Sequence, residues 1–248
     1  IDKTLEAIWK YNWAPDIALH QGPAYLDQVI FRQIQESGTR IAALEKGEVQ
    51  AAVNVPSIEA GRLDADPAFK LVVGRVPGIP FHFALNHTKP PIEDVAVRQA
   101  MNYGLDREAI VNTIYGAYQA IGANTAAYTI LAPITWGYDK NTEMYRYDAE
   151  KAMQLLDDAG WVVNPDTGIR EKDGQPLEVI LNTWEEQSVA DVAQAQLREI
   201  GIDIKLGVLP VLTVNEMQRA GESHGSPLPF ARSDPGVLAF TFHSENIG

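Results

Sequence analysis

The amino-acid sequence predicts an α/β protein, in which helices flank a mixed sheet. The clearest evidence is a run of alternating elements: a strand at 177–181, an amphipathic helix at 189–200 and a strand at 202–206. Gly201 separates the helix from the second strand, as expected just past a helix C-terminus. Composition agrees, because 46% hydrophobic and 21% charged residues are typical of a globular chain.

The N-terminal third contains further predicted strands and two short helices. The helix at 39–46 ends at Gly47, and a helix at 57–63 begins with Ser57 as its capping residue. Alternation and β-branched residues predict four strands, at 26–34, 49–55, 70–76 and 81–86.

The middle of the chain is richer in helices. Asp94, Asp106 and Asp148 are predicted N-caps for helices at 95–103, 107–115 and 148–159. Gly116 and Gly160 are expected to end the second and third of these. Two Asp-containing turns lie at 166–168 and 172–174, and a last helix at 212–220. The segment 119–142 shows little periodicity, and long irregular segments in compact domains tend to be functional.

Charge and cysteine content exclude several classes of function. The 248 residues contain 20 Lys and Arg against 33 Asp and Glu, a net charge of −13, which repels nucleic acid. The apolar runs are far shorter than the ~20 residues of a membrane span. The chain contains no cysteine, so disulfides, thiol catalysis and cysteine-based zinc sites are excluded.

The chain begins at Ile1, without a methionine and without an export signal. We therefore expect the N-terminus to be a cut end, produced by processing or by excision from a longer protein.

Several motifs, in order along the chain, resemble one bacterial family. Pro23-Ala24-Tyr25-Leu26-Asp27 resembles the family's P-Y-L-D strand start. The stretch 86–110 resembles A-L-N-x-x-x-P-P-x-x-D-x-x-V-R-Q-A followed by D-R-x-x-I, and 148–160 resembles Y-D-x-x-x-A-x-x-L-L-x-x-A-G. Further similarities occur at 40–44, 47–49, 200–202, 233–235 and 242–244. The chain thus resembles bacterial ABC-transporter substrate-binding proteins of family 5, the oligopeptide, dipeptide and nickel type.

This resemblance implies a periplasmic-binding-protein-like fold of two lobes with the ligand between them. The chain would hold part of the first lobe, to about residue 80, and most of the second, over 81–248. It implies a periplasmic or membrane-anchored monomer that captures a peptide or similar small polar solute and delivers it to ABC permease subunits. It implies no cofactor and no enzymatic activity. A solute-sensing signalling relative remains an alternative.

An enzyme is the second alternative, because residues 221–225 fit the G-x-S-x-G pattern, with Ser223 as the nucleophile. Asp234 and His243 follow in the order of an α/β-hydrolase triad. That motif requires a strand before the serine and a helix after it, whereas here a predicted helix precedes Ser223. The hydrolase reading is therefore disfavoured.

No metal site is predicted from the five histidines. His82 and His87 are five residues apart on a predicted strand and so face opposite sides of it. His243 with Asp234 and Glu245 could surround a cation, but their spacing matches no known ligand pattern.

Aromatic residues are the first candidates for ligand binding. Trp184 follows the strand at 177–181, and ligands in open α/β sheets bind beyond the carboxyl ends of strands. Trp136 and Tyr128 lie on the long irregular segment. These two residues either contact ligand or fasten the segment to the domain.

Arg232 and Asp234 are the charged candidates. The Arg232 guanidinium could hold a carboxylate in a bidentate manner, or pair with Asp234 or Glu222. Peptide-binding relatives commonly place an Asp shortly before the Asp-Pro pair, to hold the peptide's ammonium group, whereas this chain has Ala231 and Arg232. Asp234 itself could instead cap the turn at Pro235.

Overall fold

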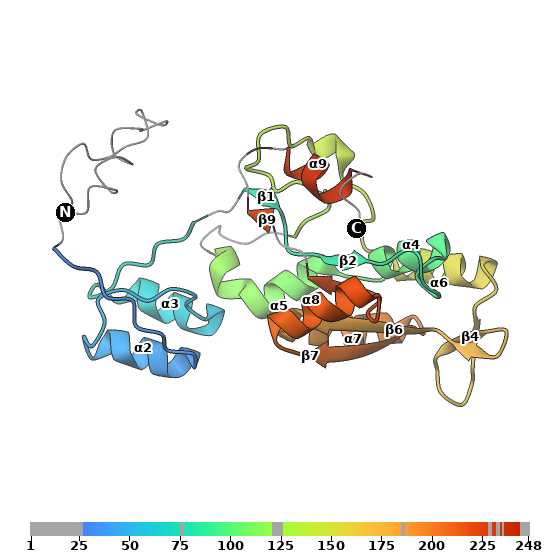
Figure 1. Cartoon of the computed structure of the whole chain (residues 1–248), viewed down its shortest axis with the longest axis horizontal. Helices are drawn as coiled ribbons and strands as arrows, with labels where there is room; N and C mark the ends of the chain where they lie inside the picture. Colours follow the sequence, from blue (N-terminus) through green and yellow to red (C-terminus); the bar gives the residue numbers. More distant parts are fainter. Residues whose placement is uncertain are drawn as a thin grey trace. The chain divides into compact units, whose positions relative to one another are not determined.

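The computed structural model describes residues 27–74, 77–120, 126–184, 187–227, 230, 231, 234 and 236–243 (Figure 1). The chain divides into two compact units, Ile1–Val55 and Pro56–Gly248. This division into compact units does not test the lobe boundary predicted near residue 80, which stays a prediction.

The first unit is organised around helix α2 (Ser37–Glu45). The Glu36 carboxylate caps it by accepting the N–H groups of Gly38, at 2.8 Å, and Thr39. The Thr39 side chain, and then these two backbone bonds, hold the pKa of Glu36 below its ordinary value. The Arg40 guanidinium then donates to the carbonyl oxygens of Ile34, at 2.8 Å, and Asn54, at 3.0 Å. Arg40 thereby ties together the two irregular segments that flank the helix.

Three of the strands predicted from sequence do not form. Residues 27–34, 49–55 and 70–74 are irregular, and the other residues of the predicted strands lie outside the described part. The apolar pattern of the first segment is left facing solvent, with the Phe31 side chain 93% exposed. Alternation predicts a strand only where a neighbouring strand accepts its hydrogen bonds, and no described strand pairs with these segments.

The second unit is built on a four-stranded mixed sheet in the order β2-β8-β6-β7. Strand β6 (Glu178–Thr183) runs parallel to β7 (Asp203–Val208) along its whole length and parallel to β8 (Gly225–Pro227) at Leu181. Strand β2 (Phe83–Leu85) is antiparallel to β8 and forms the other edge. The predicted α/β class and mixed sheet are confirmed.

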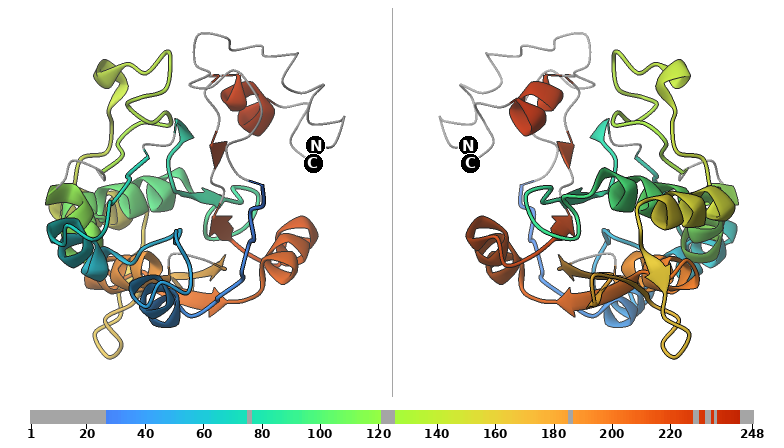
Figure 2. Two further views of the ribbon diagram at one scale, coloured as in Figure 1. Left: turned by 90° about the vertical axis from the view of Figure 1, so that its left-hand side faces the viewer. Right: turned by 90° about the vertical axis from the view of Figure 1, so that its right-hand side faces the viewer.

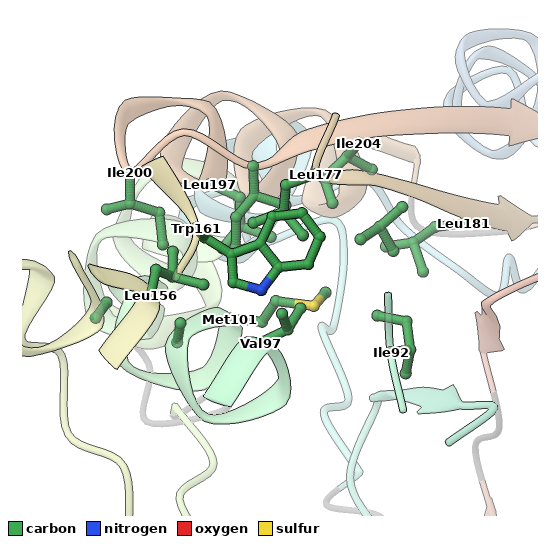
Figure 3. Close-up of a cluster of buried hydrophobic side chains, with 14 residues drawn as sticks. Ile92, Val97, Met101, Leu156, Trp161, Leu177, Leu181, Leu197, Ile200 and Ile204 are labelled. Carbon is green, nitrogen blue, oxygen red and sulfur yellow. The ribbon is translucent and has the colours of Figure 1, made fainter. Parts of the chain in front are cut away.

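Helices cover both faces of this sheet. On one face, α4 (Val95–Tyr103), α6 (Ala149–Asp158) and α7 (Gln187–Glu199) share a core with alternate residues of β6 and β7. Figure 3 shows Trp161 in this cluster, among Leu156, Leu177 and Leu197. On the other face, α8 (Val211–Ala220) contacts β6 and β8. The predicted caps Asp94 and Asp148 accept backbone N–H groups of α4 and α6, both at 2.9 Å.

Two helices differ in detail from the prediction. Helix α3 (Ser57–Ala65) has Pro56, not Ser57, at its N-cap position, because the helical conformation already begins at Ser57. Helix α5 (Arg107–Ala120) does not end at Gly116. Tyr115 is non-helical (φ −116°, ψ 19°), so the chain kinks there and continues helically to Ala120. Helices α3 and α5 pack against each other.

Two small sheets complete the described part of this unit. Strands β3 (Val162–Val163), β4 (Arg170–Lys172) and β5 (Gln175–Pro176) form an antiparallel meander, whose tight turn is the predicted Asp173-Gly174 pair with φ of 53° and 76°. Strand β1 (Gly78–Ile79) pairs with β9 (Phe230–Ala231). Figures 1 and 2 show β1, β9 and the short helix α9 (Val237–Phe242) on the side of the main sheet away from β7.

Candidate functional site

Trp184 lies where the sequence predicts it, directly beyond the carboxyl end of β6. Because β6 and β7 are parallel, their carboxyl ends meet at one edge of the sheet. The N–H of Leu209, just past β7, donates to the Thr183 carbonyl oxygen at 2.9 Å and ties the two strand ends together. The half-buried Trp184 side chain is therefore held on a rigid edge, which suits stacking on a ligand.

This edge is supported by buried polar side chains that the sequence did not predict as part of the site. Asn182 and Thr183 are 3% and 0% exposed at the end of β6. The Asn182 amide lies 3.8 Å from the Met217 sulfur of α8. Its cross-strand neighbour is Gly207, and a Cβ atom at Gly207 would lie 2.3 Å from Asn182 Oδ1. The sequence signal that could have indicated these residues is the pair Asn182-Thr183 at the end of an apolar strand. The glycine at position 207, in the next strand, is the matching signal for the close approach.

The irregular segment is fastened to the domain by Thr135, which the sequence analysis also missed. The buried Thr135 hydroxyl oxygen accepts the N–H of Gly78 at 2.7 Å and lies 3.2 Å from the Gly78 carbonyl oxygen. The N–H of Ala132 donates to that same carbonyl at 2.8 Å. Leu131 packs with Ile79 and Val237 in a small core that joins the segment to β1 and α9.

Trp136 follows Thr135 directly, and its side chain is 79% exposed. Tyr138, two residues later, packs against the small core, and its hydroxyl donates to Glu143 at 3.0 Å. The backbone is thus anchored on both sides of an indole that faces solvent. Of the two predicted alternatives, this geometry favours ligand contact for Trp136.

Tyr128 fits the other alternative better, because it is built into a polar network. The Arg146 and Arg107 guanidinium carbons lie 4.0 and 5.5 Å from the centre of its ring. Its hydroxyl reaches the Glu108 carboxylate at 3.4 Å. Burial and then Glu108 raise the pKa of Tyr128, and the two arginines oppose this shift. The N–H of Met144 donates to the Tyr128 carbonyl at 3.1 Å, which ties the irregular segment to the chain just after it.

Asp234 is exposed and caps a turn. Its Oδ1 accepts the N–H of Gly236 at 2.7 Å, and its carbonyl accepts that of Val237 at 3.2 Å. The structure thus brings Asp234 to the start of α9, beside the small core that also anchors the Trp136 segment. Arg232 lies outside the described residues.

Ser223 lacks the surroundings of a nucleophile. Helix α8 precedes it and β8 follows it, the reverse of the strand–serine–helix order. The side chain is 3% exposed, and its hydroxyl donates to the Gly225 carbonyl at 2.8 Å. The neighbouring His224 Nδ1 accepts the N–H of Ile180 at 2.9 Å. Both side chains therefore serve the junction between β6 and β8.

Within the described ranges, no three His, Asp or Glu side chains are grouped so that they could hold a metal ion. In the same ranges, every helix is too short or too polar to span a bilayer.

A mixed α/β unit with one aromatic side chain, Trp184, at the carboxyl edge of its sheet fits the class of α/β proteins in which that edge is the usual place for a ligand. Comparison with known proteins gives the family: the model of "Bacterial extracellular solute-binding proteins, family 5 Middle" matches residues 4–225. The chain belongs to this family, and the resemblance found in the sequence is confirmed.

Three relatives illustrate the similarity. The "Nickel-binding periplasmic protein" of Escherichia coli K12 is 30% identical over 227 residues, which are 88% of this chain and 39% of that protein. The structure of the oligopeptide-binding protein AppA from Bacillus subtilis, in complex with a nonapeptide, is 26% identical with a TM-score of 0.72, over 86% of this chain and 43% of that one. DppA from Helicobacter pylori, in complex with the peptide STSA, is 28% identical with a TM-score of 0.71, over 89% of this chain and 40% of that one. The chain spans less than half the length of each of these relatives.

Proposed function

We propose that this chain belongs to the solute-binding component of an ABC importer, which captures a peptide or similar small polar solute and delivers it to permease subunits. Membership of the family of extracellular solute-binding proteins supports this proposal. Two of the similar solved structures hold peptides, a nonapeptide and STSA. A peptide-like solute is therefore the class we favour.

The observation that carries the proposal is the position of Trp184. It follows β6 at the edge where two parallel strands end, and the Leu209–Thr183 hydrogen bond fixes that edge. An indole there offers a flat apolar face to a solute at little entropic cost, because its backbone is already ordered. The nearby Asn182 and Thr183 side chains are buried, which favours a single conformation of this edge.

The other predicted residues receive different roles. Trp136 offers a second aromatic face from an anchored loop. Arg232 would bind a carboxylate, and Asp234 would contact a polar group of the solute while it caps the start of α9. Tyr128 would act indirectly, by holding the loop that carries Trp136.

The proposal also covers oligomeric state, location and the motion of the lobes. The binder would be non-catalytic and monomeric, and it would work outside the cytoplasm in the periplasm or anchored to a membrane. The predicted lobes, 1–80 and 81–248, would close on the solute by a hinge motion.

A titration of this chain tests the proposal. Trialanine is added to millimolar concentrations, and binding is followed by tryptophan fluorescence and calorimetry. Saturable binding is expected, and Trp184→Ala should weaken it roughly tenfold. Tyr147→Ala is the matched control, because this exposed aromatic receives no role in the site. Equal affinities of the chain and the Trp184 variant would argue against the proposed site.

A further inference from the structure

A second candidate binding site lies on the outer side of α4, away from the carboxyl edge of the sheet. The inner side of this helix packs Val97, Ala100 and Met101 into the core. The residues spaced for the opposite stripe border a hollow of about 270 Å³. Its lining is Leu85, Val95, Arg98, Gln99, Asn102 and Tyr145. We call it the α4 hollow.

The charge of the α4 hollow contrasts with that of the chain. Arg98 is the only charged residue among the six that line it, although the net charge of the chain is −13. Arg98 Nη1 donates to the carbonyl oxygens of Ile92, at 2.6 Å, and Glu93, at 2.9 Å. Within the described part of the chain these bonds use only Nη1, so the guanidinium is held in place while Nε–H and the two hydrogens of Nη2 are left for an anion.

The opposite wall of the hollow is equally well fixed. Tyr145 has a φ of +57°, which is uncommon for a residue with a side chain. Its carbonyl oxygen accepts from Arg107 Nη1 at 2.9 Å, and Arg107 Nη2 donates to Asn102 Oδ1 at 2.8 Å. Its ring packs edge-on against Tyr103, with ring centres 5.1 Å apart. A strained residue that its neighbours hold so firmly is a mark of functional sites.

We propose that the α4 hollow binds a small organic carboxylate with a short apolar tail. The carboxylate would accept hydrogen bonds from Arg98 and from the Gln99 amide, and the tail would lie against Leu85, Val95 and the Tyr145 ring. The volume is near the lower end of the ~300–1,000 Å³ of sites for drug-sized ligands, which suits a small molecule. This site is independent of the solute site at the carboxyl ends of β6 and β7.

The experiment compares three probes of one length: hexanoate, hexanamide and hexylammonium. Each is titrated into the ¹⁵N-labelled chain, and the side-chain amide signals of Gln99 and Asn102 are followed by NMR. Hexanoate should shift these signals saturably, with a dissociation constant on the order of a millimolar for so small a ligand. The two other probes should cause no saturable shift. Equal responses to all three, or hexanoate shifts confined to other residues, would overturn the proposal.

Two variants place the binding in the α4 hollow. Gln99→Glu and Val95→Asp each add a carboxylate there and should weaken hexanoate binding roughly tenfold by repulsion. Val95→Asp preserves folding, because the first turn of a helix tolerates an acidic residue. Gln218→Glu on α8 is the matched control, since Gln218 is exposed and lies outside the lining. Unchanged binding by both hollow variants contradicts the site. Trp184→Ala should leave hexanoate binding intact. A failure of the proposed solute site at Trp184 can therefore be told apart from a failure of the α4 hollow.

Discussion

Arg170 packs so closely against Gly201 that a side chain at position 201 would collide with it. A Cβ atom on Gly201 would lie 2.7 Å from Arg170 Cγ. Arg170 is 2% exposed, and its guanidinium donates to the carbonyl oxygens of Ile200, at 2.9 Å, and Trp161, at 2.7 Å, and to the Asp157 carboxylate. The glycine between α7 and β7 therefore makes room for a buried cation that joins three segments.

Gly201→Ala should destabilise the chain by about 3 kcal/mol, because it adds a steric clash to a φ of +87°. Urea unfolding measures the loss. Gly168→Ala is the control: its φ is +72°, but nothing lies within 4 Å of the added carbon, so about 1 kcal/mol is expected. Similar losses at both positions would show that Arg170 can move away.

Gly207 and Asn182 provide a second, purely steric prediction. Gly207→Ala should cost about 2 kcal/mol, because the new carbon would collide with Asn182 Oδ1. In the double variant with Asn182→Ala that collision is gone, so the combined loss should be smaller than the sum of the single losses. Unfolding of all three variants gives the coupling. Strictly additive losses would contradict the contact, and a change in Trp184 fluorescence would link it to the sheet edge.

The stability of the chain should fall as the pH falls below about 6.5, partly through His224. Burial and then nearby Lys89 lower the pKa of His224 from 6.5, and Glu178 opposes them. The neutral ring is needed because Nδ1 accepts the Ile180 N–H. The unfolded chain therefore takes up the proton first, and the free energy of unfolding decreases from pH 6.5 down to the native pKa.

His224→Asn tests this, since an amide oxygen can accept the same hydrogen bond without titrating. The dependence of the unfolding free energy on pH should become shallower below 6.5. It should not vanish, because burial also lowers the pKa of His82 and contributes with the same sign. An unchanged slope in the variant would exclude His224 as a source.

Elements whose local signals agree with their packing could be predicted from sequence. Helix α6 has a capping Asp148, an apolar stripe and Gly160 beyond its end, and the structure has all three. The strands at 26–34 and 49–55 had good β-formers but no described partner, and pairing is a property that no single segment contains. Local patterns also could not show that α5 would kink at Tyr115 and continue.

For the candidate site, the sequence could predict which residues follow a strand end, but it could not predict which side chains contact each other. Trp184 could be placed because strand ends follow from periodicity. Thr135 could not, because its partner Gly78 is 57 residues away and a single threonine gives no signal of that bond. Tyr128 illustrates the same limit, since only the structure shows Arg107 and Arg146 beside its ring.

The Thr135 anchor yields the last prediction. Thr135→Val keeps the shape of the side chain but removes the oxygen that accepts the buried Gly78 N–H, which should cost about 2 kcal/mol. Loss of the anchor should also raise the hydrogen-exchange rates of the Gly78 and Ala132 amides, whose bonds hold the segment that carries Trp136. Thr142→Val is the control, because the Thr142 hydroxyl donates to the Asp139 carbonyl and both residues are exposed, so that among the described residues its loss leaves no buried group unpaired. If this hydrogen bond orders the loop for binding, Thr135→Val should weaken trialanine binding as well. Unchanged hydrogen exchange together with unchanged binding would show that Trp136 does not depend on this hydrogen bond.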